Sequence, residues 1–267
     1  MGAAPALVSM HGVRFAYEAT TPIIDGLTAD VPVGSIVGVV GPSGCGKSTL
    51  LSLISGLEEP GEGTLTWEPD RGSPPRHPLT MMFQKDTLLP WLTVQDNIGL
   101  HFRYRRGSRA DRAERKERVQ HLIELAGLQG WERKYPYQLS GGMRRRAAFL
   151  TAVAPNPRML LLDEPFSALD EPTRIGIHQD IFRIVKESGV TVVLITHDLG
   201  EAISLSDKVL VLSARPTTIV AEYDIPFGRE RNMMELREHS DFLELYGTTW
   251  ERLSEQIRRG AGGRSVR

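Results

Sequence analysis

A glycine-rich loop that ends in a lysine and two hydroxyl residues occupies positions 41–49, with the sequence GPSGCGKST. It satisfies the spacing G-x-x-x-x-G-K-[ST], in which the glycines let backbone N–H groups converge on phosphate oxygens. A strand-like apolar stretch precedes the loop and a stretch with helical apolar spacing follows it, so the positive end of a helix dipole points at the same place. The segment is therefore predicted to bind nucleotide phosphates.

Individual residues of this loop have distinct expected roles. Lys47 would reach the β- and γ-phosphates, and Ser48 would supply a hydroxyl to Mg²⁺. Cys45 has two interpretations: a small residue that fits inside the loop, or a thiol whose alkylation blocks nucleotide binding. The complete predicted phosphate-binding set is Gly41, Pro42, Ser43, Gly44, Cys45, Gly46, Lys47, Ser48 and Thr49.

A carboxylate pair, Asp163 and Glu164, follows the unbroken apolar run MLLL. Such a run is typical of a strand buried on both faces of a parallel sheet, and open α/β sheets hold ligands at the carboxyl ends of their strands. Asp163 is expected to hold Mg²⁺. Glu164 is expected to act as general base on the attacking water, work typically worth ~10²–10⁴ in rate. The alternative, a surface turn that ends a strand, is weakened by the phosphate loop upstream.

Three further side chains stand at the ends of strand-like segments. Gln84 ends LTMMFQ and could touch both the metal ion and the water. His197 follows VVLIT and could contact the γ-phosphate, or could be an ordinary packed or capping histidine. Tyr17 could stack on adenine, an interaction worth ~1–3 kcal/mol per base, or could be an edge aromatic residue.

A second anion-binding turn is predicted at YQLSGGMRRR, positions 137–146. Ser140, Gly141 and Gly142 would open a helix there, and the free N–H groups and dipole of a helix N-terminus favour an anion. The chain therefore holds two phosphate-type turns almost a hundred residues apart, and this duplication needs an explanation.

The elements that must position these residues follow from the apolar periodicity. A turn is expected at 21–26, a proline-rich surface loop at 69–78, and an amphipathic helix at 229–260. Strands are expected at 7–17, at 27–40 with a break at 32–34, and at 79–84, 158–163, 190–196, 208–214 and 218–225. Helices are expected after the phosphate loop, at 93–128, after Ser140, at 172–188, and in a short piece after His197.

Composition bounds the function classes. The 267 residues suffice for one large α/β domain with an appendage, and 32 Lys+Arg against 33 Asp+Glu give a net charge of −1, so no global field favours a polyanion partner. The single cysteine excludes an intramolecular disulfide framework. No run approaches the ~20 apolar residues of a membrane span. The start has no signal-peptide pattern, so a soluble cytoplasmic protein is expected. No zinc-like spacing is present, and no structural metal is predicted.

The ordered set of motifs resembles the ATP-binding subunit of ABC transporters. It comprises the phosphate loop, Gln84, LSGGM, MLLLDEP, SALD at 167–170 and His197, and the resemblance runs from about Leu7 to Tyr223. It implies an α/β fold: a P-loop NTPase (RecA-like) ABC ATPase core at 7–225, with an antiparallel β subdomain and a helical subdomain at about 86–156. Residues 226–267 would form a C-terminal helical extension and tail.

This resemblance also accounts for the second turn. In that family two ATPase domains pair head to tail, so Ser140, Gly141, Gly142 and Met143 would complete the partner's site. Asp170 of the D-loop would lie across the dimer seam. The implied cofactors are ATP and Mg²⁺, with Ser48, Gln84 and Asp163 around the metal. Glu164, His197 and Gln84 are the implied catalytic residues.

Within the family the nitrate/sulfonate/taurine-type importers are most similar, on FQKDTLLPWLTVQDNI (83–98), Met143 and LSARPTTIV (212–220). Thr151 departs from the family's usual arginine. The implied partners are a second copy of the chain, an integral membrane permease that docks on the helical subdomain, and indirectly an extracytoplasmic solute-binding protein. The implied location is the cytoplasmic face of the membrane, as a peripheral subunit.

Two alternatives share the catalytic residues. The first is a soluble ABC ATPase that acts on nucleic acid or ribosomes, supported only by the basic run between Arg103 and Arg118; the usual interpretation of such a run is a solvated helical face, and no nucleic acid is expected as a partner. The second is the ATPase subunit of an ABC exporter, which only the importer-like segments disfavour.

Overall fold

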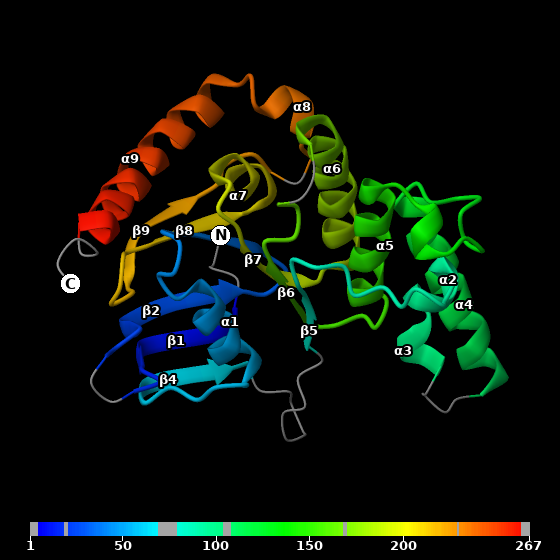
Figure 1. The fold of residues 1–267 in the computed structure, drawn as a ribbon, viewed down its shortest axis with the longest axis horizontal. Helices are drawn as coiled ribbons and strands as arrows, with labels where there is room; N and C mark the ends of the chain where they lie inside the picture. Colours follow the sequence, from blue (N-terminus) through cyan, green and yellow to red (C-terminus); the bar gives the residue numbers. More distant parts are fainter. Residues whose placement is uncertain are drawn as a thin grey trace. The chain divides into compact units, whose positions relative to one another are not determined.

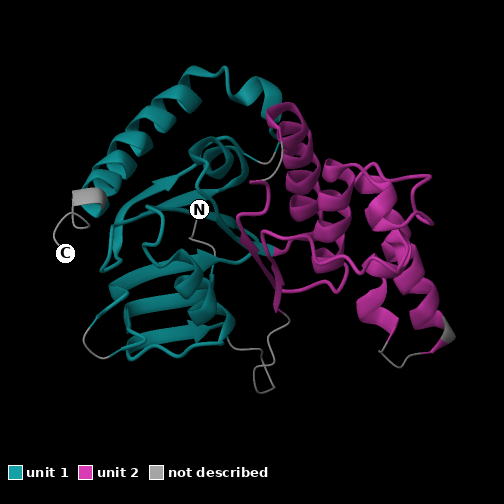
Figure 2. Ribbon diagram, in the orientation of Figure 1, with its two compact units in different colours: residues 1–76, 191–267 teal, residues 77–190 magenta. Residues whose placement is uncertain are grey.

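The computed structural model describes residues 5–18, 21–68, 79–103, 108–167, 170–228 and 230–262. It contains two compact units, coloured separately in Figure 2. Unit 1 consists of residues 1–76 and 191–267, and unit 2 consists of residues 77–190. The expected proline-rich loop at 69–78 lies outside the described residues, as do Ala168 and Leu169 of the SALD motif.

An antiparallel sheet of unit 1 has the strand order β2-β1-β4. Its strands are β1 (Ala6–Phe15), β2 (Ile24–Pro32) and β4 (Glu62–Trp67). Val8 in the central strand pairs with Val31 on one side and Trp67 on the other. β4 is not among the strands predicted from the sequence, and β2 begins at Ile24, inside the turn predicted at 21–26.

The other strands of unit 1 gather around β3, and Figure 1 shows them with their helices. They are β3 (Ile36–Val40), β7 (Thr191–Ile195), β8 (Lys208–Leu212) and β9 (Ile219–Asp224). β3 pairs in parallel with β7 on one side and β8 on the other, and β9 adds antiparallel to β8. Every residue of β3 and β7 is buried, as the unalternating apolar sequences predict.

The helices of unit 1 include the predicted one after the phosphate loop. They are α1 (Lys47–Ser55), α7 (Leu199–Leu205), α8 (Met233–Leu236) and α9 (Ser240–Gly262). The single amphipathic helix expected at 229–260 is therefore two helices. Glu238 N donates to Glu235 O and His239 N to Leu236 O, and these tight i→i−3 bonds end α8 before α9 begins.

The C-terminal segment is part of the core of unit 1. Phe242 and Leu253 of α9 pack in one buried cluster with Ile203 of α7 and with Val40, the last residue of β3. The Arg231 guanidinium is buried as well, and it donates to Ser204 O at 2.9 Å and to Ser206 O at 2.7 Å. This burial lowers the pKa of Arg231, which the nearby carboxylate of Asp207 partly offsets.

Unit 2 joins a parallel strand pair to a set of helices. β5 (Leu79–Met82) pairs residue for residue with β6 (Met159–Asp163), from Leu79 with Met159 to Met82 with Leu162. The helices are α2 (Val94–Ile98), α3 (Leu100–Arg103), α4 (Arg109–Leu125), α5 (Gly141–Val153) and α6 (Glu171–Ser188), with a 3₁₀ turn at Pro136–Gln138. The one helix expected at 93–128 is thus α2, α3 and α4, and α4 begins afresh at a capping box of Ser108 and Asp111.

Among the residues that the structure describes, no helix is both long and apolar enough to span a bilayer.

Packing of α9 predicts the effect of two adjacent substitutions. Phe242 is 4% exposed, whereas Leu243 is 58% exposed. Phe242→Ala should lower the free energy of unfolding by about 3–5 kcal/mol, because it removes a buried ring from the cluster beneath α7. Leu243→Ala should change it by no more than about 0.5 kcal/mol. Denaturant unfolding of both variants measures this, and equal effects would contradict the buried position of α9.

Candidate active site

The phosphate loop of unit 1 follows β3, and two of its glycines stand where there is no room for a side chain. A Cβ at Gly41 would lie 2.9 Å from Leu212 Cβ, and one at Gly46 would lie 2.9 Å from Ile23 Cγ2. Gly46 also has φ +123°, in a region that other residues rarely adopt. The loop is therefore built from backbone held close to its neighbours, as an anion cradle requires.

Lys47 brings a positive charge to this cradle. Its side chain is 8% exposed, and Nζ donates to Gly41 O at 2.9 Å and to Pro42 O at 3.0 Å. The ammonium thus lies within the loop at the first residue of α1, where the positive end of the helix dipole adds to it. Ser48, the next residue, is exposed. Backbone, lysine and helix terminus together fit a polyphosphate.

A segment after β8 supports the loop from outside. Thr217 N donates to Ile23 O at 2.7 Å, and the Thr217 hydroxyl donates to Cys45 O. Cys45 is 2% exposed, and burial raises the pKa of its thiol. Since the thiolate is the reactive form, this environment favours the interpretation of Cys45 as a small structural residue.

His197 and Tyr17 belong to the same unit as the loop. The β3–β7 register ends with Val39 paired to Ile195, and Gly41 and the exposed His197 each follow two residues further along their own segments. Tyr17 is 61% exposed and meets Phe15 edge to face at 4.9 Å between ring centroids. The backbone of Phe15 in turn accepts a hydrogen bond from Ile23 N, and the side chain of Ile23 lies next to Gly46. Tyr17 is therefore connected to the phosphate loop through Phe15 and Ile23.

In unit 2 the structure brings Gln84 and Glu164 together. Asp163 ends β6, and Glu164 follows it with φ 45°, a left-handed conformation that a non-glycine residue rarely adopts. Gln84 lies two residues beyond β5 and not on it; its Nε2 donates to Ser167 Oγ at 3.1 Å, and Ser167 Oγ donates to Glu164 O at 3.3 Å. Backbone strain at such a residue is typical of functional sites.

The second anion turn has the expected helix N-terminus. Ser140 caps α5, and its hydroxyl accepts from Met143 N at 3.3 Å. A Cβ at Gly142 would lie 2.8 Å from Thr173 Cγ2, so the turn packs closely on α6. Asp170 caps α6, and hydrogen bonds from Thr173 lower the pKa of its carboxyl. Ser140 and Gly141 are exposed.

One residue of this site was not predicted. Arg145 of α5 is 5% exposed, and its guanidinium contacts the segments that carry Gln84 and Glu164. The sequence gives one signal that could have found it: Arg145 is spaced three and four residues before the buried Ala148 and Phe149, so it belongs to the inner face of the helix. The neighbouring Arg144 and Arg146 are half-buried.

Comparisons with known proteins give the class. The family model described as ABC transporter matches residues 24–167. Over 240 residues the chain is 40% identical to the uncharacterized ABC transporter ATP-binding protein YtlC of Bacillus subtilis (strain 168), and the match covers 89% of this chain and 90% of YtlC. The chain belongs to the ABC transporter family, as an ATP-binding subunit and an ATPase.

Other matches have names that specify a direction of transport. The chain is 37% identical to an aliphatic sulfonates import ATP-binding protein, SsuB of Bacillus cereus, covering 82% of this chain and 86% of SsuB. It is 34% identical to the taurine import ATP-binding protein TauB of Jannaschia sp. (strain CCS1), covering 86% and 87%. Proteins named for nitrate import and bicarbonate transport match as well, and the chain spans 35% of their length.

A solved structure supports the same class. The dimeric post-hydrolysis state of the ATP-binding cassette MJ0796 bound to ADP and Pi superposes with a TM-score of 0.66 at 28% identity, covering 83% of this chain and all of that one. The α/β P-loop fold of the ABC ATPase predicted from the sequence is confirmed.

The packing around Gly46 predicts a loss of nucleotide binding on substitution. Gly46→Ala should abolish it, because the methyl group meets Ile23 Cγ2 and the φ angle is unfavourable. Gly56→Ala is the matched control: Gly56 has φ +74° at the end of α1 with open space around it. It should cost about 1–2 kcal/mol of stability and leave binding intact. Equilibrium titration with a fluorescent ATP analogue compares them.

Proposed function

We propose that the chain is the ATP-hydrolysing subunit of an importer, which energises uptake of a small solute of the nitrate, sulfonate or taurine kind through a separate permease. The observation that carries this proposal is the match to import ATP-binding proteins over more than four fifths of the chain. The named bicarbonate relative adds a fourth small solute to the class.

We infer the roles of the individual residues in hydrolysis from their positions in the family's motifs. Lys47 and the loop amides hold the β- and γ-phosphates, and His197 contacts the γ-phosphate. Glu164 accepts a proton from water as its oxygen attacks the γ-phosphorus, and the bond to the β–γ bridging oxygen breaks to release ADP. Tyr17 stacks on adenine.

Mg²⁺ is the proposed cofactor. Ser48, Gln84 and Asp163 offer hydroxyl, amide and carboxylate oxygens, the donor types that this ion prefers. When bound, the ion neutralises charge that develops on the phosphate oxygens. Ser48 is exposed and Asp163 is half-buried at the end of β6, so each side chain can approach a ligand within its own unit.

The second anion turn is assigned to a partner subunit. We infer a head-to-tail homodimer in which Ser140, Gly141, Gly142 and Met143 close over the γ-phosphate held by the other copy, with Asp170 at the seam. The exposed cap of α5 supports this, because its N–H groups are directed away from the helix and favour an anion. The solved relative described as dimeric supports the pairing.

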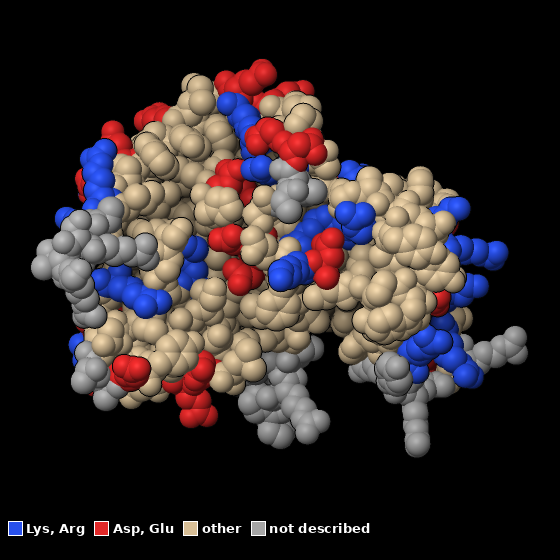
Figure 3. All heavy atoms as spheres, in the orientation of Figure 1, with Lys and Arg blue, Asp and Glu red and all other residues tan. Residues whose placement is uncertain are grey.

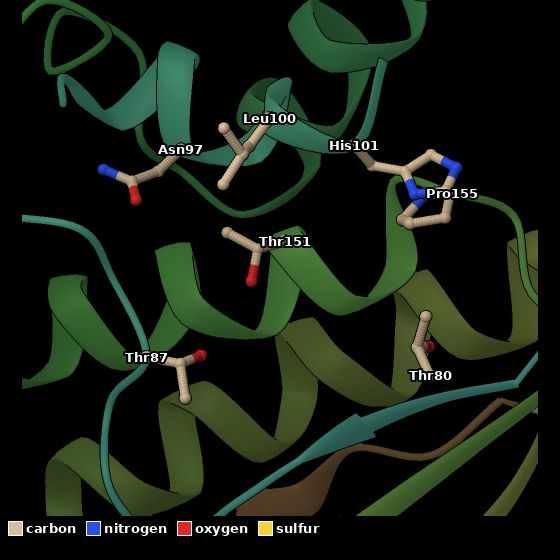
Figure 4. Close-up of a pocket in the computed structure, with 7 residues that line it drawn as sticks. All are labelled: Thr80, Thr87, Asn97, Leu100, His101, Thr151 and Pro155. Carbon is tan, nitrogen blue, oxygen red and sulfur yellow. The ribbon is translucent and has the colours of Figure 1, made fainter. Parts of the chain in front are cut away.

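The permease is proposed to dock on unit 2, beside the segment that carries Gln84. Phe83 and Trp91 are 49% and 69% exposed, and large exposed aromatic residues are enriched at interfaces. A hollow of about 640 Å³ lies nearby. Figure 4 shows Thr151 between Leu100 and Thr87 among the residues that line this hollow. This docking would place the subunit at the cytoplasmic face of the membrane.

The role of Glu164 leads to a prediction about assembly. Glu164→Gln should accumulate as an ATP-bound dimer, since binding survives while the general base is lost. Light scattering with ATP and Mg²⁺ should report a doubled mass that persists. Glu187→Gln on α6, an exposed carboxylate paired with His121, is the matched control and should remain at the parent's mass. A strictly monomeric Glu164→Gln protein would argue against the composite site.

The role of Ser140 leads to a separate prediction about turnover. Ser140→Arg should abolish ATP hydrolysis and leave the affinity of the isolated subunit for ATP nearly unchanged, because the bulky side chain obstructs only the partner's site. Ser108→Arg removes a serine cap from α4 in the same way, at a cost of about 1 kcal/mol, and should retain hydrolysis. Equal loss of binding and turnover at Ser140 would contradict the assignment.

The nucleic-acid alternative finds little support in the charges. Most of the face in Figure 3 is neither basic nor acidic, and basic side chains gather in several places, one of them the edge where α4 lies. Of that basic run, Arg118 donates to Ala154 O at 2.9 Å and Arg115 lies over the Phe102 ring, so both serve contacts inside unit 2. The exporter alternative is disfavoured by the import names of the relatives.

Purification of the tagged chain in mild detergent from the cell that makes it tests the proposed function. An integral membrane permease should co-purify, and its solute-binding protein should stimulate ATP hydrolysis with nitrate, a sulfonate, taurine or bicarbonate. A preparation that holds only nucleic acid or ribosomes, with binding that weakens steeply as salt rises, would keep the ATPase and overturn the transport function.

A further inference from the structure

The guanidinium of Arg145 is a buried hub of unit 2. Its Nε donates to Pro165 O, Nη1 donates to Gln84 O at 2.9 Å and to Asp86 Oδ1 at 3.0 Å, and Nη2 donates to Phe83 O at 2.9 Å. Three of these acceptors are main-chain carbonyls. The carboxylate of Asp86 supplies a negative charge against the buried cation.

These carbonyls belong to the two segments on which hydrolysis depends. Phe83 and Gln84 are the first residues after β5, and Pro165 directly follows Glu164. Arg145 therefore fixes the backbone from which the Gln84 side chain projects, and it anchors the turn that holds Glu164 at φ 45°. The hydroxyl of Ser167 joins the same segments a second time, from Gln84 Nε2 to Glu164 O.

Only an arginine can make this set of contacts. Its planar fork presents five N–H donors on three nitrogens in fixed directions, whereas a lysine has three donors on one nitrogen at the end of a flexible stem. Three separate carbonyls in different directions need the fork. A substitution that keeps the charge and loses the fork would leave at least part of the set unpaired.

Arg145 lies on the same helix, α5, as the Ser140 cap. Its helix begins at Gly141, so the arginine stands little more than one turn from the Ser140 cap. The same rigid element thus carries the turn assigned to the partner's phosphate and the clamp on this subunit's own Gln84 and Glu164.

We propose that Arg145 is a positioning residue for ATP hydrolysis, which holds Gln84 and Glu164 in reacting register and ties that register to the α5 helix whose N-terminus faces the partner's nucleotide. The inference rests on the proposed function. Arg145 contacts no substrate itself; it acts through the two residues that do. Misplacing such residues by about 1 Å can cost on the order of 10²-fold in rate.

The first test separates kcat from KM. Arg145→Lys should lower kcat for ATP by about 30–100-fold and leave KM and nucleotide affinity within a factor of about two. Arg118→Lys is the matched control: Arg118 is half-buried and also donates to main-chain carbonyls, those of Ala154 and Val153 at the other end of α5. It should keep the parent's kcat. Equal loss in both variants, or a rise in KM alone, would overturn the proposal.

A double-mutant cycle on kcat distinguishes a role through Gln84 from a general loss of stability. If Arg145 acts through Gln84, then Arg145→Lys should lower kcat much less in a Gln84→Ala background than in the parent protein. Multiplicative effects would mean that the two residues act independently. The Arg145→Lys change in the Glu164→Gln background should still yield the ATP-bound dimer, because binding does not need the clamp.

A second variant keeps the inference testable if Arg145→Lys fails to fold. Asp86→Asn preserves the shape of the acceptor and removes its charge, and it should reduce kcat by an intermediate factor at unchanged KM. A parent-like kcat in a folded Asp86→Asn protein would contradict the proposal. The parent's own hydrolysis is measured first: a parent that hydrolyses no ATP refutes the proposed function, whereas an active parent with an equally active Arg145→Lys refutes only the role of Arg145.

Discussion

In unit 1 the arrangement of the phosphate loop depends on the tight packing of its glycine backbone against neighbouring side chains. Leu212 at the end of β8 lies against Gly41, and Ile23 just before β2 lies against Gly46, at distances that exclude a methyl group. Thr217 adds a further contact through Cys45 O. Because the loop is immobilised by residues distant in sequence, its N–H groups can be aimed before any anion arrives, and little ordering remains to be done on binding.

In unit 2 the guanidinium of Arg145 holds the backbone of the candidate site in place. Gln84 and Glu164 follow the carboxyl ends of the paired parallel strands β5 and β6, so both lie at the same edge of the sheet. Beyond that edge their backbone has no neighbouring strand with which to form hydrogen bonds. Arg145 and Ser167 supply those partners from outside the strands. The strained backbone at Glu164 persists because the surrounding hydrogen bonds determine it.

Local patterns account for what could be predicted. The phosphate loop, the buried strands β3, β6 and β7, and the helix that begins after Ser140 all follow from neighbouring residues, so the sequence indicates them directly. β4 was missed because only its last residues alternate: in EGTLTW, Leu65 and Trp67 are half-buried and the other four residues are exposed. Arg145 escaped notice because the carbonyls it contacts lie about 20 and 60 residues away along the chain, which no local periodicity reveals. The subdomain boundary at about 86–156 and the roles of the site residues stay predictions.

The packing of α9 bears on whether the stretch matched by the family model could fold by itself. That model ends at residue 167, yet the cluster behind β3 is completed by Ile203, Val209, Phe242 and Leu253. A fragment cut to the matched stretch would lack the partners of β3 on both sides and would present that strand's apolar faces to water. The recognisable stretch is therefore not an autonomous folding unit, and a chimera that exchanged only this stretch with a relative would have to match an interior formed by the far end of the chain.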